Sequence, residues 1–104
     1  MTSKQRAYLK GLAMNLETVF QVGKSSVTPE MVQALDDVLE KRELIKVGVL
    51  QNCADDPREL ALIIAERTRS EVVQTIGKKM VFYRPAKDPK KRRIELPPAG
   101  KKAL

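Results

Sequence analysis

The residues best suited to chemistry lie in Thr18–Thr28, which reads TVFQVGKSSVT. A β-branched run ends there at Gly23, and three polar residues follow before Thr28-Pro29-Glu30, a pattern typical of a helix start. A small-residue turn before a helix N-terminus can form a phosphate-sized concavity, because backbone N–H groups point outward and the helix dipole adds partial positive charge. The sequence therefore predicts a contact with a nucleic-acid backbone at Gly23, Lys24, Ser25 and Ser26.

Two other interpretations of this loop compete with that one. Gly-Lys-Ser also ends the P-loop pattern of nucleotide-binding proteins, but that pattern needs a glycine five positions before Gly23, where Thr18 stands. The second alternative is a plain strand-to-helix turn that carries an exposed lysine. Glu30 weighs against phosphate binding, since a carboxylate in the first helical turn competes for the same dipole.

The rest of the chain offers little for catalysis. It has no histidine, so the commonest general base is missing, and its one cysteine, Cys53, cannot build a zinc site. Asp55-Asp56 is explained as helix capping, and Asp36-Asp37 are adjacent helical residues that point about 100° apart. We therefore expect no enzymatic activity, no cofactor and no metal.

Charge and composition indicate the class of partner. The 104 residues carry a net charge of +7, and seven of the 20 Lys and Arg side chains lie in residues 85–104 with only two acidic ones. This excess favours an acidic partner, meaning nucleic acid or an anionic membrane surface. No apolar run approaches the roughly 20 residues of a membrane span, and MTSKQRAYLK lacks a secretory h-region. With a single cysteine, we expect a soluble cytoplasmic protein.

The hydrophobic pattern alternates between helices and strands. Helices are expected at 3–16, from 29 to about 41 with Thr28 as N-cap, and from 57 to about 70 with Asp56 as N-cap, each of the last two with proline at its first position. Their predicted buried positions are Leu9, Leu12, Ala13, Leu16, Met31, Val32, Leu35, Val38, Leu39, Leu60, Ile63 and Ile64. Strands are expected at 18–22, 43–50, 72–76 and 80–84, the last two joined by a tight turn at Gly77-Lys78-Lys79. Gly48 inside the second strand indicates a bulge or a close approach by another backbone.

This order predicts a single α/β domain over residues 1–86, with a four-stranded mixed sheet and helices packed on it. Residues 87–104 hold clustered charge and little apolar content, so a basic, Pro-containing, disordered tail is predicted there. Local docking of Ile94 and Leu96 is the alternative for part of that tail.

Several strings, taken in order, resemble the CRM domain (chloroplast RNA splicing and ribosome maturation), most closely its stand-alone bacterial YhbY-like form. They are KQRAYLKGLA, VGKSSVT, LEKRELIKV and VVQTIGKKMVFYRP, and together they span roughly residues 3–86. The resemblance implies a fold similar to the C-terminal domain of translation initiation factor three. It also implies RNA binding and association with precursors of the large ribosomal subunit. The family loop reads Gly-x-x-Gly and is likened to the KH loop; here Gly23 matches and Ser26 replaces the second glycine.

Further basic residues are expected to extend the RNA contact beyond the loop. We predict one continuous basic rim that joins Lys24 to the body residues Lys4, Arg6, Lys10, Lys46, Lys78, Lys79 and Arg84, with added phosphate contacts from the tail residues Lys90, Lys91, Arg92 and Arg93. Lys46 interrupts an apolar strand, so its ammonium either touches a phosphate or only snorkels to the rim. Lys78 and Lys79 have simple solvation as their alternative, and the tail has a solubilising role as its alternative.

The resulting hypothesis is a non-enzymatic, monomeric RNA-binding protein, cytoplasmic and ribosome-associated, that binds ribosomal RNA of precursor large subunits. Because the aromatic residues are few and scattered, recognition should rest on phosphates and shape rather than on base stacking. The alternative is an adaptor whose basic tail binds an acidic protein partner. A DNA-binding interpretation has the same electrostatics but lacks a helix-turn-helix pattern.

Overall fold

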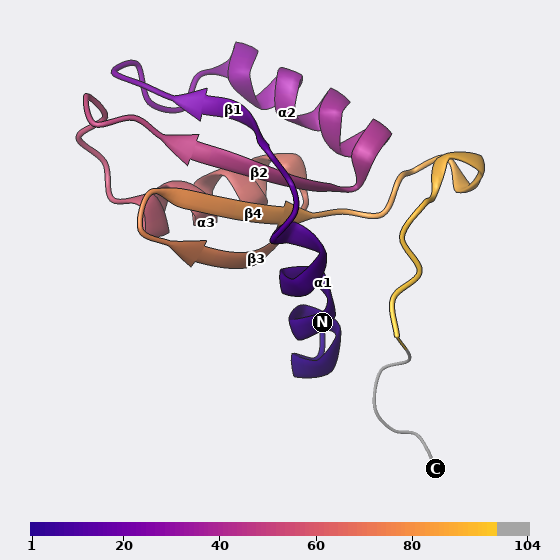
Figure 1. Cartoon of the computed structure of the whole chain (residues 1–104). Coiled ribbons are helices and arrows are strands. Elements are labelled where there is room, and N and C mark those ends of the chain that lie inside the picture. Colours follow the sequence, from indigo (N-terminus) through magenta and orange to yellow (C-terminus); the bar gives the residue numbers. More distant parts are fainter. Residues whose placement is uncertain (98–104) are drawn as a thin grey trace.

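Three helices and one four-stranded sheet form the protein in the computed structural model, which describes residues 1–97 (Figure 1). The order along the chain is α1 (Ser3–Ala13), β1 (Thr18–Val22), α2 (Pro29–Arg42), β2 (Leu44–Val49), α3 (Pro57–Thr68), β3 (Glu71–Ile76), β4 (Lys79–Tyr83) and a 3₁₀ turn, η1 (Pro89–Lys91). The sheet order is β1-β2-β4-β3, with β1 parallel to β2 and the other pairs antiparallel. The predicted α/β class and mixed sheet are confirmed. None of the helices within residues 1–97 is long and apolar enough to cross a membrane.

The helices begin at residues that satisfy their first N–H groups. Thr28 accepts a hydrogen bond from Met31 N at the start of α2, and Asp56 accepts one from Arg58 N at the start of α3. Both helices have proline at the first position, as predicted. α1 ends three residues earlier than predicted, because the N–H groups of Asn15 and Leu16 donate to the carbonyls three residues before them, as in a turn, instead of four.

The sheet separates two apolar cores (Figure 1). On one face, α2 and α3 cover the larger core, which is built around Leu35, Leu39, Ile64 and Phe82. On the other face, α1 and the C-terminal segment cover a smaller core around Leu9, Val81 and Tyr83. β2 serves both, since Ile45, Val47 and Val49 belong to the larger core and Leu44 belongs to the smaller one.

Two predicted core positions are exposed, and a third, Val32, is only half-buried and belongs to neither core. Ile63 and Leu12 are 39% and 38% exposed. The buried stripe of α3 instead runs through Leu60, Ala61, Ile64 and Thr68, because the helix rests on the sheet along a line one residue away from the predicted one.

The prediction of a bulge or a close backbone approach at Gly48 is wrong, because side chains rather than a backbone lie against this glycine. A Cβ placed there would clash with the side chain of Gln21, which pairs with Gly48 in the neighbouring strand. The register shift in this strand pair lies at Thr18/Phe20, so the bulge is in β1. The missing side chain lets Gln21 lie across the sheet.

The C-terminal segment is tied to the body by Glu43. This residue caps α2 with a left-handed backbone (φ 67°) and is fully buried. Its carboxylate accepts N–H bonds from Ala86 (2.8 Å), Arg93 and Ile94 (2.9 Å). Ile94 and Leu96 then pack against the smaller core. The structure therefore has the alternative, local docking of Ile94 and Leu96, in place of a disordered tail over residues 87–97, and residues 98–104 lie outside the described part.

Acid should loosen this attachment. Burial raises the pKa of Glu43, but the N–H bonds from Arg93, Ala86 and Ile94, with nearby Arg92, lower it to a net value below the usual 4.5. A carboxyl whose pKa is lower when folded contributes stability above its unfolded pKa and loses that contribution as pH falls through the folded value. We expect the Arg93 and Ile94 amide resonances to titrate together below pH 4.5. Glu43→Gln should abolish that transition; if it persists in the variant, Glu43 is not the group that titrates.

Candidate nucleic-acid interface

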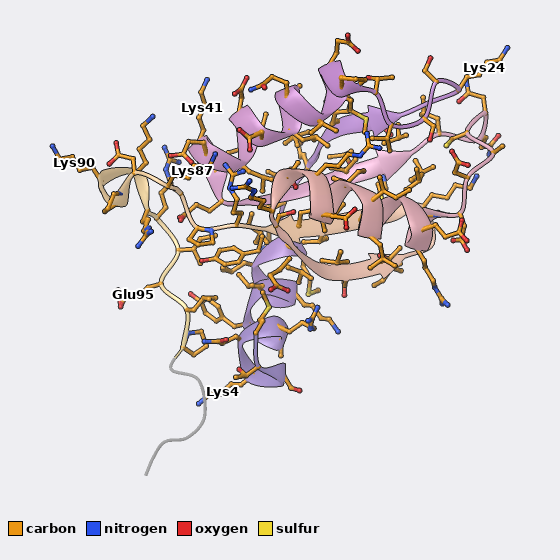
Figure 2. All side chains as sticks on the ribbon, turned by 180° about the vertical axis from the view of Figure 1, so that it is seen from behind. Lys4, Lys24, Lys41, Lys87, Lys90 and Glu95 are labelled. Atoms are coloured by element: carbon orange, nitrogen blue, oxygen red, sulfur yellow. The ribbon has the colours of Figure 1, made fainter. Side chains whose placement is uncertain are left out.

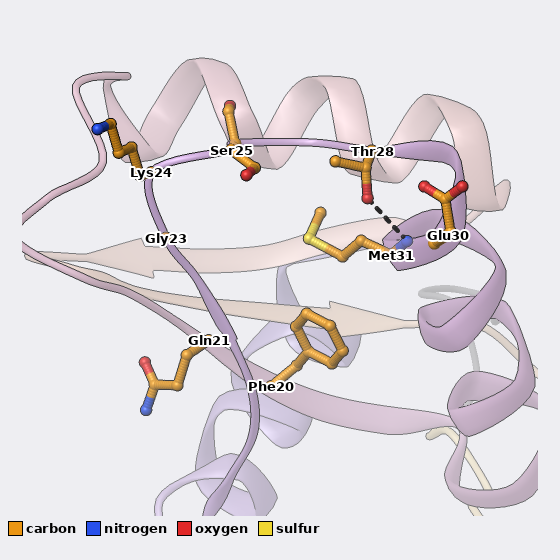
Figure 3. A pocket seen from close by; sticks show the side chains of 9 residues that line it. Phe20, Gln21, Gly23, Lys24, Ser25, Thr28, Glu30 and Met31 are labelled. Carbon is orange, nitrogen blue, oxygen red and sulfur yellow. Dashed lines mark hydrogen bonds between the residues drawn. The ribbon is translucent and has the colours of Figure 1, made fainter.

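The loop after β1 forms an open concavity at one end of the sheet (Figure 3). It is about 330 Å³ in volume and is lined by Phe20, Gln21, Gly23, Lys24, Ser25, Ser26, Thr28, Glu30 and Met31. The Gly23 carbonyl accepts a hydrogen bond from Ser26 N at 3.0 Å, which closes a four-residue turn. Lys24 and Ser25 are exposed at the middle of that turn. The structure therefore brings the four predicted loop residues together at one accessible place.

Ser26 occupies the backbone conformation that the second family glycine would favour. Its φ is 56°, in the left-handed region, where a residue with a Cβ is strained by roughly 1 kcal/mol. Its hydroxyl donates to the carboxylate of Asp55, in the loop that follows β2. The loop thus keeps a glycine-like backbone with serine in place, and the Asp55 bond offsets part of the strain.

The concavity is lined both by groups that attract an anion and by one carboxylate that repels it. Within residues 1–97, the N–H groups of Lys24 and Ser25 donate no hydrogen bond, so both can meet a ligand oxygen. The first turn of α2 adds its dipole at the same place, with Thr28 Oγ1 3.1 Å from Met31 N (Figure 3). Glu30 lines the same space and opposes an anion. The unbonded N–H groups and the exposed Lys24 are therefore the groups in this concavity with the chemistry to contact a phosphate.

Two of the predicted lysines lie on the face of the sheet that carries the smaller core. Lys46 and Lys79 line a hollow of about 480 Å³ together with Glu17, Gln74 and Ile76. Lys79 Nζ donates to Thr18 Oγ1 at 3.2 Å, so this ammonium is held across the sheet. Lys78 is exposed in the turn between β3 and β4. Lys78 and Lys79 lie near the strand ends that precede the loop, whereas Lys46 lies inside β2 opposite Thr18, and none of the three lines the loop concavity.

The basic residues of α1 divide into exposed and bonded ones. Lys4 and Lys10 are exposed and are available for a ligand. Arg6 is half-buried, and its Nη1 donates to the backbone carbonyls of Val72 and Val73 in β3 (3.2 Å to Val73). Arg6 therefore fastens α1 to the edge strand, which differs from the predicted phosphate contact.

Arg84 corrects the prediction most clearly. Its side chain is only 6% exposed, and it forms ion pairs with Asp36 and with Glu40 (3.4 Å). It also donates to the carbonyls of Thr68 (3.0 Å) and Asp36 (3.2 Å). Arg84 follows β4 at the end where Leu44 begins β2, whereas Lys24 lies beyond the opposite ends of the strands. The predicted continuous rim that joins Lys24 to Arg84 is therefore wrong, and the guanidinium links α2, α3 and β4.

A second basic region forms at this opposite end. Lys41, in the last turn of α2, and the tail residues Lys90, Lys91, Arg92 and Arg93 line a concavity of about 400 Å³. We call these five residues the basic cradle. Sequence reasoning missed Lys41 as a site residue because it was explained by the helix dipole. The sequence feature that could have indicated a docked tail was Glu43, which stands at the start of an apolar strand. A carboxylate buried at such a place needs N–H donors from another segment.

Within residues 1–97, no group of three His, Cys, Asp or Glu side chains could hold a metal ion. Cys53 is a buried free thiol in the larger core.

Ser26→Gly tests the loop geometry. The change relieves the left-handed strain and removes the Asp55 bond, two effects of about 1 kcal/mol with opposite signs. We therefore expect the free energy of unfolding to change by less than about 1 kcal/mol. Ser26→Val, a β-branched residue in the same conformation, should cost roughly 2 kcal/mol. Equal stability of the two variants in urea denaturation would show that position 26 is not left-handed.

Arg84→Ala tests the structural role of Arg84. Its removal strands the Asp36 carboxylate and the Thr68 carbonyl, and partial exposure of Asp36 reduces the cost to about 2–3 kcal/mol. Arg42→Ala, an exposed arginine on α2, is the matched control and should change stability by less than about 0.5 kcal/mol. Similar thermal unfolding of the two variants would contradict the buried ion pair.

Comparisons with known proteins identify the family to which this fold belongs. The model of the CRS1 / YhbY (CRM) domain matches residues 1–84. The chain is 44% identical over 97 residues to "Probable RNA-binding protein YqeI" of Bacillus subtilis, covering 93% of this chain and 99% of that protein. It is 34% identical to an "RNA-binding protein" of Haemophilus influenzae, covering 93% and 95%. The solution structure of the hypothetical protein SAV1595 from Staphylococcus aureus matches with a TM-score of 0.75 and 50% identity, covering 93% and 99%. The chain belongs to the CRS1 / YhbY (CRM) domain family.

Proposed function

We propose that this protein is a non-enzymatic RNA-binding protein that binds ribosomal RNA in precursors of the large ribosomal subunit. RNA binding is supported by the names of the relatives from Bacillus subtilis and Haemophilus influenzae. The observation that carries it is the exposed turn at Lys24 and Ser25, which presents backbone N–H groups beside the start of α2 in a chain of net charge +7. The ribosomal target rests on the resemblance of the sequence to the YhbY-like proteins.

Recognition in this proposal depends on phosphates and on the shape of the RNA. Phe82 and Tyr83 are buried and Phe20 is half-buried, so of the four aromatic side chains only Tyr8 is exposed, on α1. A single exposed ring gives no strip on which successive bases could stack. The loop N–H groups and Lys24 would hold one phosphate, and exposed lysines elsewhere would add sequence-independent affinity.

The same proposal places the protein in the cytoplasm with ribosomal particles, as a monomer. The alternative function is an adaptor that binds an acidic protein through the basic cradle. The two functions differ in their ligand, because an RNA-binding protein should lose affinity for RNA steeply with salt whereas an adaptor should bind RNA only weakly.

Lys24→Glu is the direct test of the loop. Reversing this charge should weaken binding to ribosomal RNA by about tenfold, equivalent to ~1.4 kcal/mol, because a phosphate ligand is lost and repulsion is added. Binding is measured by fluorescence anisotropy over a series of salt concentrations, where the wild-type affinity should fall steeply. Arg67→Glu is the control, since it makes the same reversal at an exposed site on α3. Equal affinity of the two variants, with both folded, would contradict the loop assignment.

Crosslinking in cells identifies the RNA. We expect the attached RNA to be mainly ribosomal and the protein to sediment with precursor large subunits in a gradient. Enrichment of messenger or transfer RNA, without ribosomal RNA, would contradict the proposed target.

A further inference from the structure

The basic cradle is held in place by three kinds of contact. The Glu43 carboxylate accepts from the N–H groups of Arg93 and Ile94, which fixes the end of the cradle. Asp88 caps η1 by accepting from Lys90 N at 3.0 Å, which fixes its beginning. The Ile94 and Leu96 side chains pack on the smaller core. The segment is therefore ordered before any ligand binds.

The acidic groups near the cradle are already engaged. Besides Glu43, Glu40 accepts from the N–H groups of Lys87 (2.9 Å) and Asp88 (3.1 Å), and these two bonds are the main reason that its pKa is lowered. All five residues that line the concavity are basic. Arg92 is oriented by a bond from its Nε to the Ala86 carbonyl (2.9 Å), and its Nη atoms donate no hydrogen bond within residues 1–97. Glu95 is exposed, and in Figure 2 it lies well below Lys41 and Lys90.

The cradle and the loop lie at the two ends of α2. Thr28 and the loop precede the helix, and Lys41 is in its last turn. Figure 2 shows Lys24 at one end of the molecule and Lys41, Lys87 and Lys90 at the other. The 14 residues of α2 separate them by about 20 Å at 1.5 Å per residue. A single phosphate group cannot reach both places, but one RNA strand or helix can.

We propose that the basic cradle is a second, preformed phosphate-binding site for the same RNA, so that the protein contacts the RNA at both ends of α2. This inference rests on the proposed function and adds that the C-terminal segment binds as a folded surface. A flexible tail would lose conformational entropy on binding, whereas the docked segment has lost most of it during folding. The geometry, as well as the number of charges, therefore contributes to affinity.

The first experiment removes cradle charge without disturbing the anchors. Lys90→Gln with Lys91→Gln keeps the backbone bonds and neutralises two exposed lysines. The matched control is Arg67→Gln with Arg69→Gln, two exposed arginines near the end of α3. We expect the cradle variant to bind ribosomal RNA at least tenfold more weakly than the control. The slope of log K against log salt concentration should also become less steep by about 1.4 to 1.8, the change expected when two phosphate contacts are lost. Equal affinities and slopes for the two variants would overturn the proposal.

The second experiment detaches the segment and keeps its charge. Ile94→Ser with Leu96→Ser removes both apolar anchors and leaves the net charge at +7. If the docked geometry contributes, RNA affinity should fall at least threefold while the sheet amides remain protected from hydrogen exchange. Val32→Ser, a half-buried position on α2, serves as the control for a general loss of apolar contacts. Undiminished affinity, with amide exchange showing that residues 93 and 94 are released, would show that the tail acts only as a flexible polycation and would overturn the proposal.

The failures of the two proposals are distinguishable. If wild-type protein does not bind ribosomal RNA, the proposed function fails. If it does bind and Lys24→Glu weakens it, but the cradle variants match their controls, only the second site fails.

Discussion

The buried carboxylate of Glu43 is the interaction that joins the end of α2 and the start of β2 to the C-terminal segment. Its left-handed backbone ends α2 and starts β2, and its side chain collects N–H groups from residues 86, 93 and 94. A carboxylate buried among apolar residues would be costly without such partners, so the fold and the path of the C-terminal segment are coupled. Replacement of this one residue would therefore affect both the sheet and a surface far along the chain.

The order of helices and strands along the chain, the helix starts and the loop after the first strand could be predicted from the sequence because each depends on neighbouring residues. Thr28 before Pro29 and Asp56 before Pro57 begin helices by local hydrogen bonds. The loop at Gly23–Ser26 follows from a strand that ends next to a helix start. Even the conformation of Ser26 was indicated, since the family pattern has a glycine at that position.

The roles of arginines and of the tail could not be predicted in the same way, since they depend on contacts between distant residues. Arg84 meets Asp36 and Glu40 only after α2 has packed against β2 and α3, and Arg6 meets the carbonyls of β3 only after α1 has docked. In the sequence, all of these are simply cations in a basic chain. In the sequence, Ile94 and Leu96 are likewise two apolar residues in a polar stretch. Their role becomes visible only in the fold, where they pack against the smaller core.

Because β1 and β2 are parallel, their C-terminal ends lie next to each other at the same end of the sheet. The segments that follow Val22 and Val49 therefore leave the sheet side by side. Asp55 reaches the Ser26 hydroxyl from the second segment, and the Leu50 Cδ1 lies 3.4 Å from where a Cβ of Gly23 would be. The segment after Val49 thus contacts the loop after Val22 and stabilises its conformation. Under the proposed function, a substitution in residues 50–56 would therefore weaken RNA binding at the loop without removing any atom that is proposed to contact the RNA.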